Sequence, residues 1–117
     1  MVSWNNLDTL SSYKELADVK PACLTEVMSG DNGAERVKNY SIPMAAGLSY
    51  NYASKQVDEN VLAALEKLAD EAQLADKFKA LYNGEVVNTG EKRLVLHHMT
   101  RGQLGDAVEA DGVDKRT

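Results

Sequence analysis

Residues 58–75 read DENVLAALEKLADEAQLA, and their apolar positions recur at the three- and four-residue steps of an α-helix. The apolar stripe consists of Val61, Leu62, Leu65, Leu68, Ala69 and Ala72. The charged residues on the opposite face are Glu66, Lys67, Asp70 and Glu71. Asp58 and Glu59 put negative charge at the N-terminal end, where the helix dipole favours it by roughly 0.3 to 1 kcal/mol. The pattern predicts a helix from Asp58 to about Ala75 with one buried face.

A shorter helix is predicted directly downstream, over Asp76–Tyr82, with Phe78 and Leu81 buried. Asn83-Gly84 should end it, because this pair tolerates a positive φ angle.

Upstream, the apolar side chains of residues 40–52 occupy alternate positions on either side of Gly47: Ile42, Met44, Leu48, Tyr50 and Tyr52. This alternation predicts a short β-hairpin. Pro43 cannot donate a ladder hydrogen bond, so the first strand should be an edge strand or only partly paired. A lone hairpin is marginal in water, so its apolar side chains must pack on helices or on other polypeptide.

The N-terminal third is predicted to be helical. Ser3 is expected to cap a first helix with apolar positions Trp4, Leu7, Leu10, Leu16 and Ala17. Pro21 suits the first turn of a second helix through Met28, which residues 30–33 (GDNG) then interrupt, before one or two helical turns over residues 34–38. The predicted fold is therefore mainly α with one hairpin, in a single domain or domain fragment covering residues 1–117.

Composition narrows the classes of function. The 117 residues carry 18 acidic and 13 basic side chains, a net charge of −5, which gives no electrostatic reason to expect nucleic acid or an anionic membrane as partner. The single cysteine, Cys23, forms no intrachain disulfide and is expected to be an inert packed thiol, which fits a reducing, cytoplasmic compartment. Residues 1–22 have no continuous apolar stretch, so we expect neither a signal peptide nor a membrane helix. The polar, acidic run Gly105–Thr117 is expected to mark a boundary inside a longer protein.

Residues 83–101 read NGEVVNTGEKRLVLHHMTR, an order that no general rule of helix or turn construction requires. After a loop at residues 86–90, a final short helix is predicted from Leu94 to near Gly102. Arg93, His97 and Arg101 then fall at steps of four along one helical face, which could attract a phosphate group. The structural interpretation, which we favour, is that Glu91 caps the helix or pairs with an arginine while Arg93 and Arg101 form bidentate hydrogen bonds to a larger protein.

Several other chemical interpretations fail on spacing. Asp70 and Glu71 are adjacent on a helix and cannot both reach one reacting atom. His97 and His98 fail as a metal pair for the same reason. Residues 84–92 do not match a phosphate-binding loop, because Gly90 is followed by Glu91 and not by Lys then Ser or Thr. The sequence thus predicts no catalytic, cofactor or metal residue here.

The string Gly84-Glu85-x-Val87-Asn88, followed by Glu91-x-Arg93-x-x-Leu96-His97 and Arg101, resembles the N-terminal region of the glucose-6-phosphate isomerase family. A second match is residues 48–55 (LSYNYASK), where the family has an aspartate-tyrosine-serine-lysine type segment before a long helix. The resemblance covers about Tyr40 to Asp114, whereas residues 1–39 match only as a general helical lead-in. Ala53 is read as an insertion, and the family more often has Asn-Tyr-Thr-Glu at residues 88–91, which indicates a divergent bacterial-type branch.

The resemblance implies a parent α/β enzyme with two sugar isomerase domains that converts glucose 6-phosphate to fructose 6-phosphate through a cis-enediol, without metal or cofactor. It also implies a homodimer whose catalytic base, ring-opening groups and phosphate site lie in downstream domains absent from these residues. This chain would then be inactive alone, have the rest of the polypeptide as its partner, and use its motif residues structurally: Gly84, Glu85, Asn88, Glu91, Arg93, His97 and Arg101. The alternative is a free-standing helical module that binds a partner protein without catalysis.

Overall fold

The computed structural model describes residues 2–101, 109–110 and 113–114. The chain divides into two compact units. The middle unit comprises Ser12–Lys67, and the terminal unit comprises Met1–Ser11 with Leu68–Thr117. The expectation of a single domain over residues 1–117 remains a prediction.

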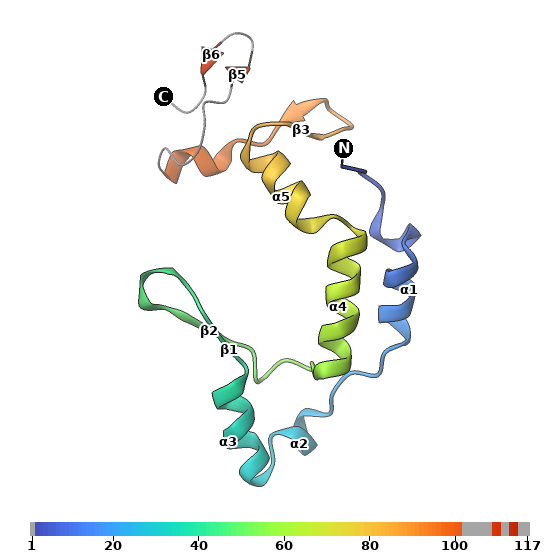
Figure 1. The fold of residues 1–117 in the computed structure, drawn as a ribbon, viewed down its shortest axis with the longest axis vertical. Coiled ribbons are helices and arrows are strands. Elements are labelled where there is room, and N and C mark those ends of the chain that lie inside the picture. Colours follow the sequence, from blue (N-terminus) through green and yellow to red (C-terminus); the bar gives the residue numbers. More distant parts are fainter. Residues whose placement is uncertain (1, 102–108, 111–112, 115–117) are drawn as a thin grey trace. The chain divides into compact units, whose positions relative to one another are not determined.

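The middle unit contains three helices before its hairpin: α1 (Ser11–Asp18, all but its first residue), α2 (Leu24–Val27) and α3 (Gly30–Asn39). Strands β1 (Ser41–Pro43) and β2 (Ser49–Asn51) follow, and then helix α4 (Glu59–Glu71), which the unit boundary divides at Lys67. Figure 1 shows the hairpin continuing directly from the end of α3. The prediction of a mainly α fold with a short hairpin at about residues 40–52 is confirmed.

The hairpin pairs antiparallel with Ile42 opposite Tyr50 and Pro43 opposite Ser49. Its turn includes the 3₁₀ turn η2 (Ala45–Gly47), in which Ala46 and Gly47 have φ values of 58° and 72°. Glycine adopts that conformation without steric cost, which explains its position at the turn. A two-stranded ladder has only edges, so Pro43 fits in it as expected.

Helix α4 begins where the sequence predicts. The Asp58 carboxylate oxygen Oδ1 accepts hydrogen bonds from the backbone N–H groups of Asn60 and Val61, both at 3.0 Å, and so caps the helix. The helix ends at Glu71, however, not near Ala75. Gln73 adopts a left-handed conformation with φ 55°, and α5 (Leu74–Tyr82) then begins two residues earlier than expected. Neither a glycine nor a proline stands at this break, and the apolar periodicity continues through it. The pattern therefore predicts one continuous helix across residues 71–74.

The N-terminal prediction is wrong in its boundaries. Ser3 caps no helix, because residues 7–9 form only the 3₁₀ turn η1 (Leu7–Thr9) and α1 begins at Ser11. The Thr9 hydroxyl donates to the Asn6 carbonyl at 2.7 Å, the kind of local side-chain bond that competes with an α-helix. The Ser3 N–H instead donates to the Gln73 side chain at 2.8 Å, within the terminal unit.

The predictions around α2 and α3 also need correction. Pro21 precedes α2 by three residues and is not in its first turn. Residues 30–33 are predicted to separate two helical segments, but they form the first turn of α3, which starts at Gly30. Gly33 is buried, and a Cβ atom placed on it would lie 2.3 Å from the Met28 carbonyl oxygen. The glycine is therefore required by close backbone packing between α2 and α3.

Helix α5 ends as predicted at Asn83-Gly84. Gly84 has φ 78°, its N–H donates to the Leu81 carbonyl, and the Glu85 N–H donates to the Ala80 carbonyl at 2.9 Å. These two bonds form a Schellman motif, which satisfies carbonyls left free at a helix C-terminus. Burial of Phe78, by contrast, is a wrong prediction, because its side chain is 63% exposed.

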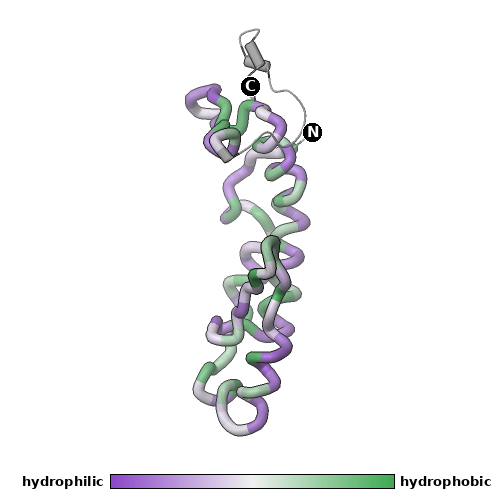
Figure 2. The backbone as a smooth tube through the Cα atoms, turned by 90° about the vertical axis from the view of Figure 1, so that its left-hand side faces the viewer, coloured by the Kyte–Doolittle hydropathy of each residue, from purple (hydrophilic) through white to green (hydrophobic). Residues whose placement is uncertain are grey.

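Large apolar side chains are not enclosed in either unit. The buried apolar residues of the described chain are all alanines: Ala22, Ala53, Ala64, Ala72 and Ala80. Among the residues whose burial the structure describes, thirteen large apolar ones are exposed, including Leu48, Leu74 and Phe78. Figure 2 shows hydrophobic positions recurring along helices and hairpin. The described helices and hairpin are thus amphipathic, and many of their large apolar side chains are exposed.

Candidate functional site

The motif residues 83–101 form a second small hairpin in the terminal unit. Strands β3 (Val86–Asn88) and β4 (Arg93–Leu94) pair antiparallel, with Val86 opposite Leu94, Asn88 opposite Arg93, and an irregularity between Val86 and Asn88. The predicted loop at residues 86–90 and the helix from Leu94 are therefore wrong. Short apolar runs such as Leu94–Leu96 fit a strand and a helix equally well, so periodicity could not separate the two.

The turn between β3 and β4 is held by Asn88 and Glu91. The Asn88 side-chain oxygen accepts from the Glu91 N–H at 3.1 Å, and its Nδ2 group donates to the Glu91 carboxylate at 3.3 Å. Glu91 Oε2 also lies 3.9 Å from Nη1 of Arg93. Both charged side chains are largely exposed, so this pair contributes at most about 1 kcal/mol. The contacts among Asn88, Glu91 and Arg93 thus stabilise the turn between the two strands.

The remaining motif residues lie on a 3₁₀ helix, η3 (His97–Arg101). Arg93 is on strand β4, so the predicted alignment of Arg93, His97 and Arg101 along one helical face is wrong. His97 is exposed, and its carbonyl accepts from the Thr100 hydroxyl at 2.8 Å. The Arg101 side chain lies outside what the structure describes, so its expected bidentate contacts stay a prediction.

His98, which the sequence analysis considered only as a metal ligand, connects η3 to α5. Its ring stacks on Tyr82 with centroids 4.7 Å apart, and its Nε2 lies 3.1 Å from the Tyr82 carbonyl oxygen. That carbonyl belongs to the last turn of α5, where helix carbonyls lack an internal partner. With the proton on Nε2, His98 donates to this carbonyl and orders the segment. No local sequence signal distinguishes this histidine from its neighbour.

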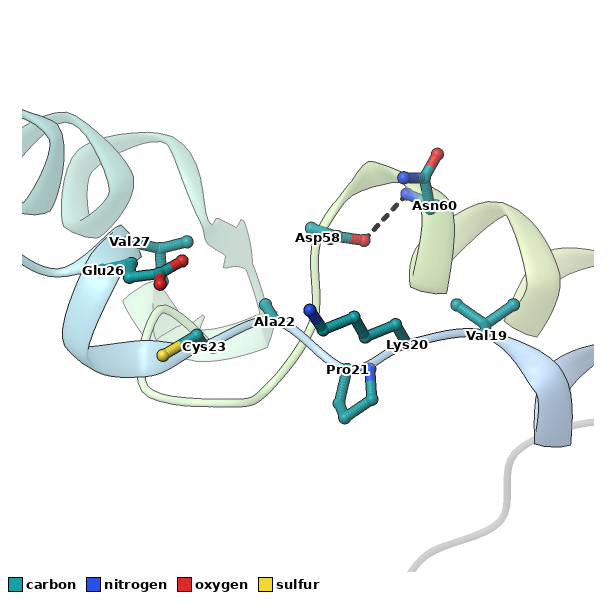
Figure 3. Close-up of a pocket in the computed structure, with 9 residues that line it drawn as sticks. All are labelled: Val19, Lys20, Pro21, Ala22, Cys23, Glu26, Val27, Asp58 and Asn60. Carbon is teal, nitrogen blue, oxygen red and sulfur yellow. Dashed lines mark hydrogen bonds between the residues drawn. The ribbon is translucent and has the colours of Figure 1, made fainter.

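The middle unit has a hollow of about 320 Å³ beside α2, lined by polar and apolar side chains and shown in Figure 3. Its ionisable lining residues are Lys20, Cys23, Glu26 and Asp58. The Asp58 carboxylate is already used to cap α4, as the dashed line in Figure 3 marks. Cys23 is exposed, so its predicted packing is wrong. The hollow is lined by residues of the middle unit, whereas the motif belongs to the terminal unit.

Neither a metal-binding cluster nor a membrane-spanning helix is found among the described residues. Among those residues, no group of three or more His, Cys, Asp or Glu side chains is placed to hold a metal ion. No helix there has the length and apolar character needed to span a bilayer.

Comparison with known proteins gives one consistent result. The family described as phosphoglucose isomerase matches residues 51–117. Glucose-6-phosphate isomerase of Treponema denticola is 42% identical over 121 residues, covering 99% of this chain and 23% of that protein. The Treponema pallidum (strain Nichols) and Borreliella afzelii proteins of the same name are 47% and 44% identical, covering 86% and 95% of this chain and 19% and 20% of the relatives.

The resemblance seen in the motif residues is therefore confirmed, and it extends further than expected. A match covering 99% of the chain includes residues 1–39, which by their own pattern suggested only a general helical lead-in. The chain spans about a fifth of the length of the curated relatives it matches.

Proposed function

This chain belongs to the phosphoglucose isomerase family, and we propose that it supplies the N-terminal part of a longer glucose-6-phosphate isomerase. The observation that carries the proposal is 42% identity over 99% of the chain to a relative of that name. The whole enzyme would interconvert glucose 6-phosphate and fructose 6-phosphate, an aldose–ketose isomerisation of glycolysis and gluconeogenesis.

Within that enzyme, residues 84–101 act as structural supports. Gly84 ends α5 through its positive φ angle, and Asn88 orders the β3–β4 turn through two hydrogen bonds to Glu91. Arg93 adds an exposed contact to Glu91. An isomerase needs a base, stabilising donors for the enediol and a phosphate site around one cavity. We place these groups in the remainder of the polypeptide.

The exposed apolar residues support a role as one piece of a larger body. Burial of large apolar side chains is the main favourable term in folding, yet the buried apolar residues described here are all alanines. The proposal includes the rest of the polypeptide as cover, a homodimeric enzyme, a cytoplasmic location and a reaction without metal or cofactor.

A segment exchange tests the proposal. The matching segment of the Treponema denticola isomerase is replaced by this chain, and the chimera is produced in a host that lacks its own isomerase. We expect the chimera to interconvert the two sugar phosphates, whereas the 117 residues alone give no turnover above a blank. A folded chimera without activity, or turnover by the 117 residues alone, would contradict the proposal. The first result would favour the interaction module instead.

A further inference from the structure

The β1–β2 hairpin has one apolar and one polar face. Ile42 and Tyr50 are directly paired and therefore project to the same side, whereas the flanking pair, Ser41 and Asn51, projects to the other. Both apolar side chains are about half exposed, at 51% and 48%. The ladder register thus places the two large apolar side chains of the strands on one face, while Pro43 and Ser49 lie with Ser41 and Asn51 on the other.

That face borders an apolar groove of about 270 Å³ within the middle unit. Its apolar lining comes from the hairpin, the segment after it and the first turns of α4: Ile42, Tyr50, Tyr52, Val57, Leu62 and Leu65. Lys55 is the charged member of the lining. Tyr52 is fixed in place by stacking on Tyr40, with ring centroids 4.8 Å apart. The groove is therefore a preformed apolar surface with a cationic group in its lining.

We propose that this groove is covered by the remaining polypeptide of the same isomerase subunit. This inference rests on the proposed function. It adds that the Ile42 and Tyr50 face of the hairpin is the surface that packs against the rest of the subunit. An apolar segment of the downstream chain would lie over Ile42 and Tyr50, with an acidic or carbonyl group near Lys55.

The choice of occupant follows from chain length. The relatives are four to five times longer than this chain, because it spans only 19 to 23% of them. A covalently attached segment acts at an effective concentration on the order of millimolar, well above that of a second copy in dilute solution. The remaining polypeptide therefore has first access to an exposed apolar groove on its own subunit.

Cysteine labelling tests the docking directly. Cys23 is replaced by serine, and then Ile42→Cys or the matched control Ser41→Cys is introduced into the 117-residue chain and into the full-length Treponema denticola chimera. Maleimide labelling rates are compared. We expect Ile42→Cys to react at least ten-fold more slowly in the chimera than in the 117-residue chain, while Ser41→Cys changes less than three-fold.

Three results would overturn the docking: equal rates at position 42 in both proteins, equal protection of positions 41 and 42, or protection at position 42 that disappears on dilution. The last result would assign the groove to a second copy. Isomerase activity of the unlabelled chimera is measured separately. An active chimera with an unprotected groove refutes only the docking, and a protected but inactive chimera refutes only the proposed function.

Discussion

Replacing Arg36 by methionine should destabilise the middle unit by about 3 kcal/mol. The side chain is only 8% exposed, and its guanidinium donates to the carbonyls of Ala53, Lys55 and Val57 at 2.8, 2.9 and 2.6 Å. Hydrogen bonds from a charged donor contribute about 1.5 kcal/mol each at the lower end of their range, so three give about 4.5 kcal/mol. The carbonyl of exposed Lys55 can bond water instead, which recovers about 1.5 kcal/mol.

The free energy of unfolding is measured by urea denaturation followed by far-ultraviolet circular dichroism. Arg93→Met is the matched control, since Arg93 makes one exposed contact at 3.9 Å and its loss should cost less than about 0.5 kcal/mol. Arg36→Lys should be intermediate, because an ammonium group cannot reproduce the planar fork of donors. Equal stability of Arg36→Met and Arg93→Met would refute the reasoning.

Three further substitutions test other elements. Gly33→Ala should cost about 1 to 3 kcal/mol in urea unfolding, because the new methyl group meets a backbone oxygen at 2.3 Å, whereas Gly90→Ala, whose nearest neighbour lies at 3.7 Å, should be near neutral. Asp58→Ala should lower stability by about 1 kcal/mol and Asp58→Asn by less; equal losses would exclude capping. Burial and the hydrogen bond to Glu59 raise the pKa of Tyr40 above its ordinary 10.0, so the phenol holds its proton more tightly when folded. The contribution of this hydrogen bond to stability is complete below about pH 10 and falls as the pH rises through the raised pKa. Above about pH 10, Tyr40→Phe should therefore lose less stability than the parent protein, and parallel curves of stability against pH would contradict this.

Elements with a local chemical signal could be predicted from the sequence. The start of α4 next to Asp58, the end of α5 at Asn83-Gly84 and the hairpin indicated by the alternation around Ile42 each depend on a few neighbouring residues, and the structure confirms all three. The left-handed conformation of Gln73 has no such signal in the sequence, because glutamine is common in helices and the apolar periodicity continues beyond it.

Long-range contacts could not be predicted in the same way. Arg36 reads as one more charge on a helix, because its acceptors are peptide carbonyls that the fold brings from 17 to 21 residues away. The prediction that Phe78 is buried rests on its place in the apolar face of a helix. Such a face indicates that the helix packs against something, but it does not say whether the partner lies within these 117 residues. For the motif, the residue identities indicated the family while the backbone between Val86 and Leu94 remained ambiguous.

The acceptors of the Arg36 guanidinium do not ionise, and the guanidinium itself keeps its charge throughout the range in which proteins work. Acidification weakens ion pairs because it neutralises carboxylates, but it leaves the three hydrogen bonds of Arg36 chemically unchanged. Residues 53–57, which follow the first hairpin, should therefore stay hydrogen-bonded to α3 in acid, whereas exposed ion pairs on the surface weaken.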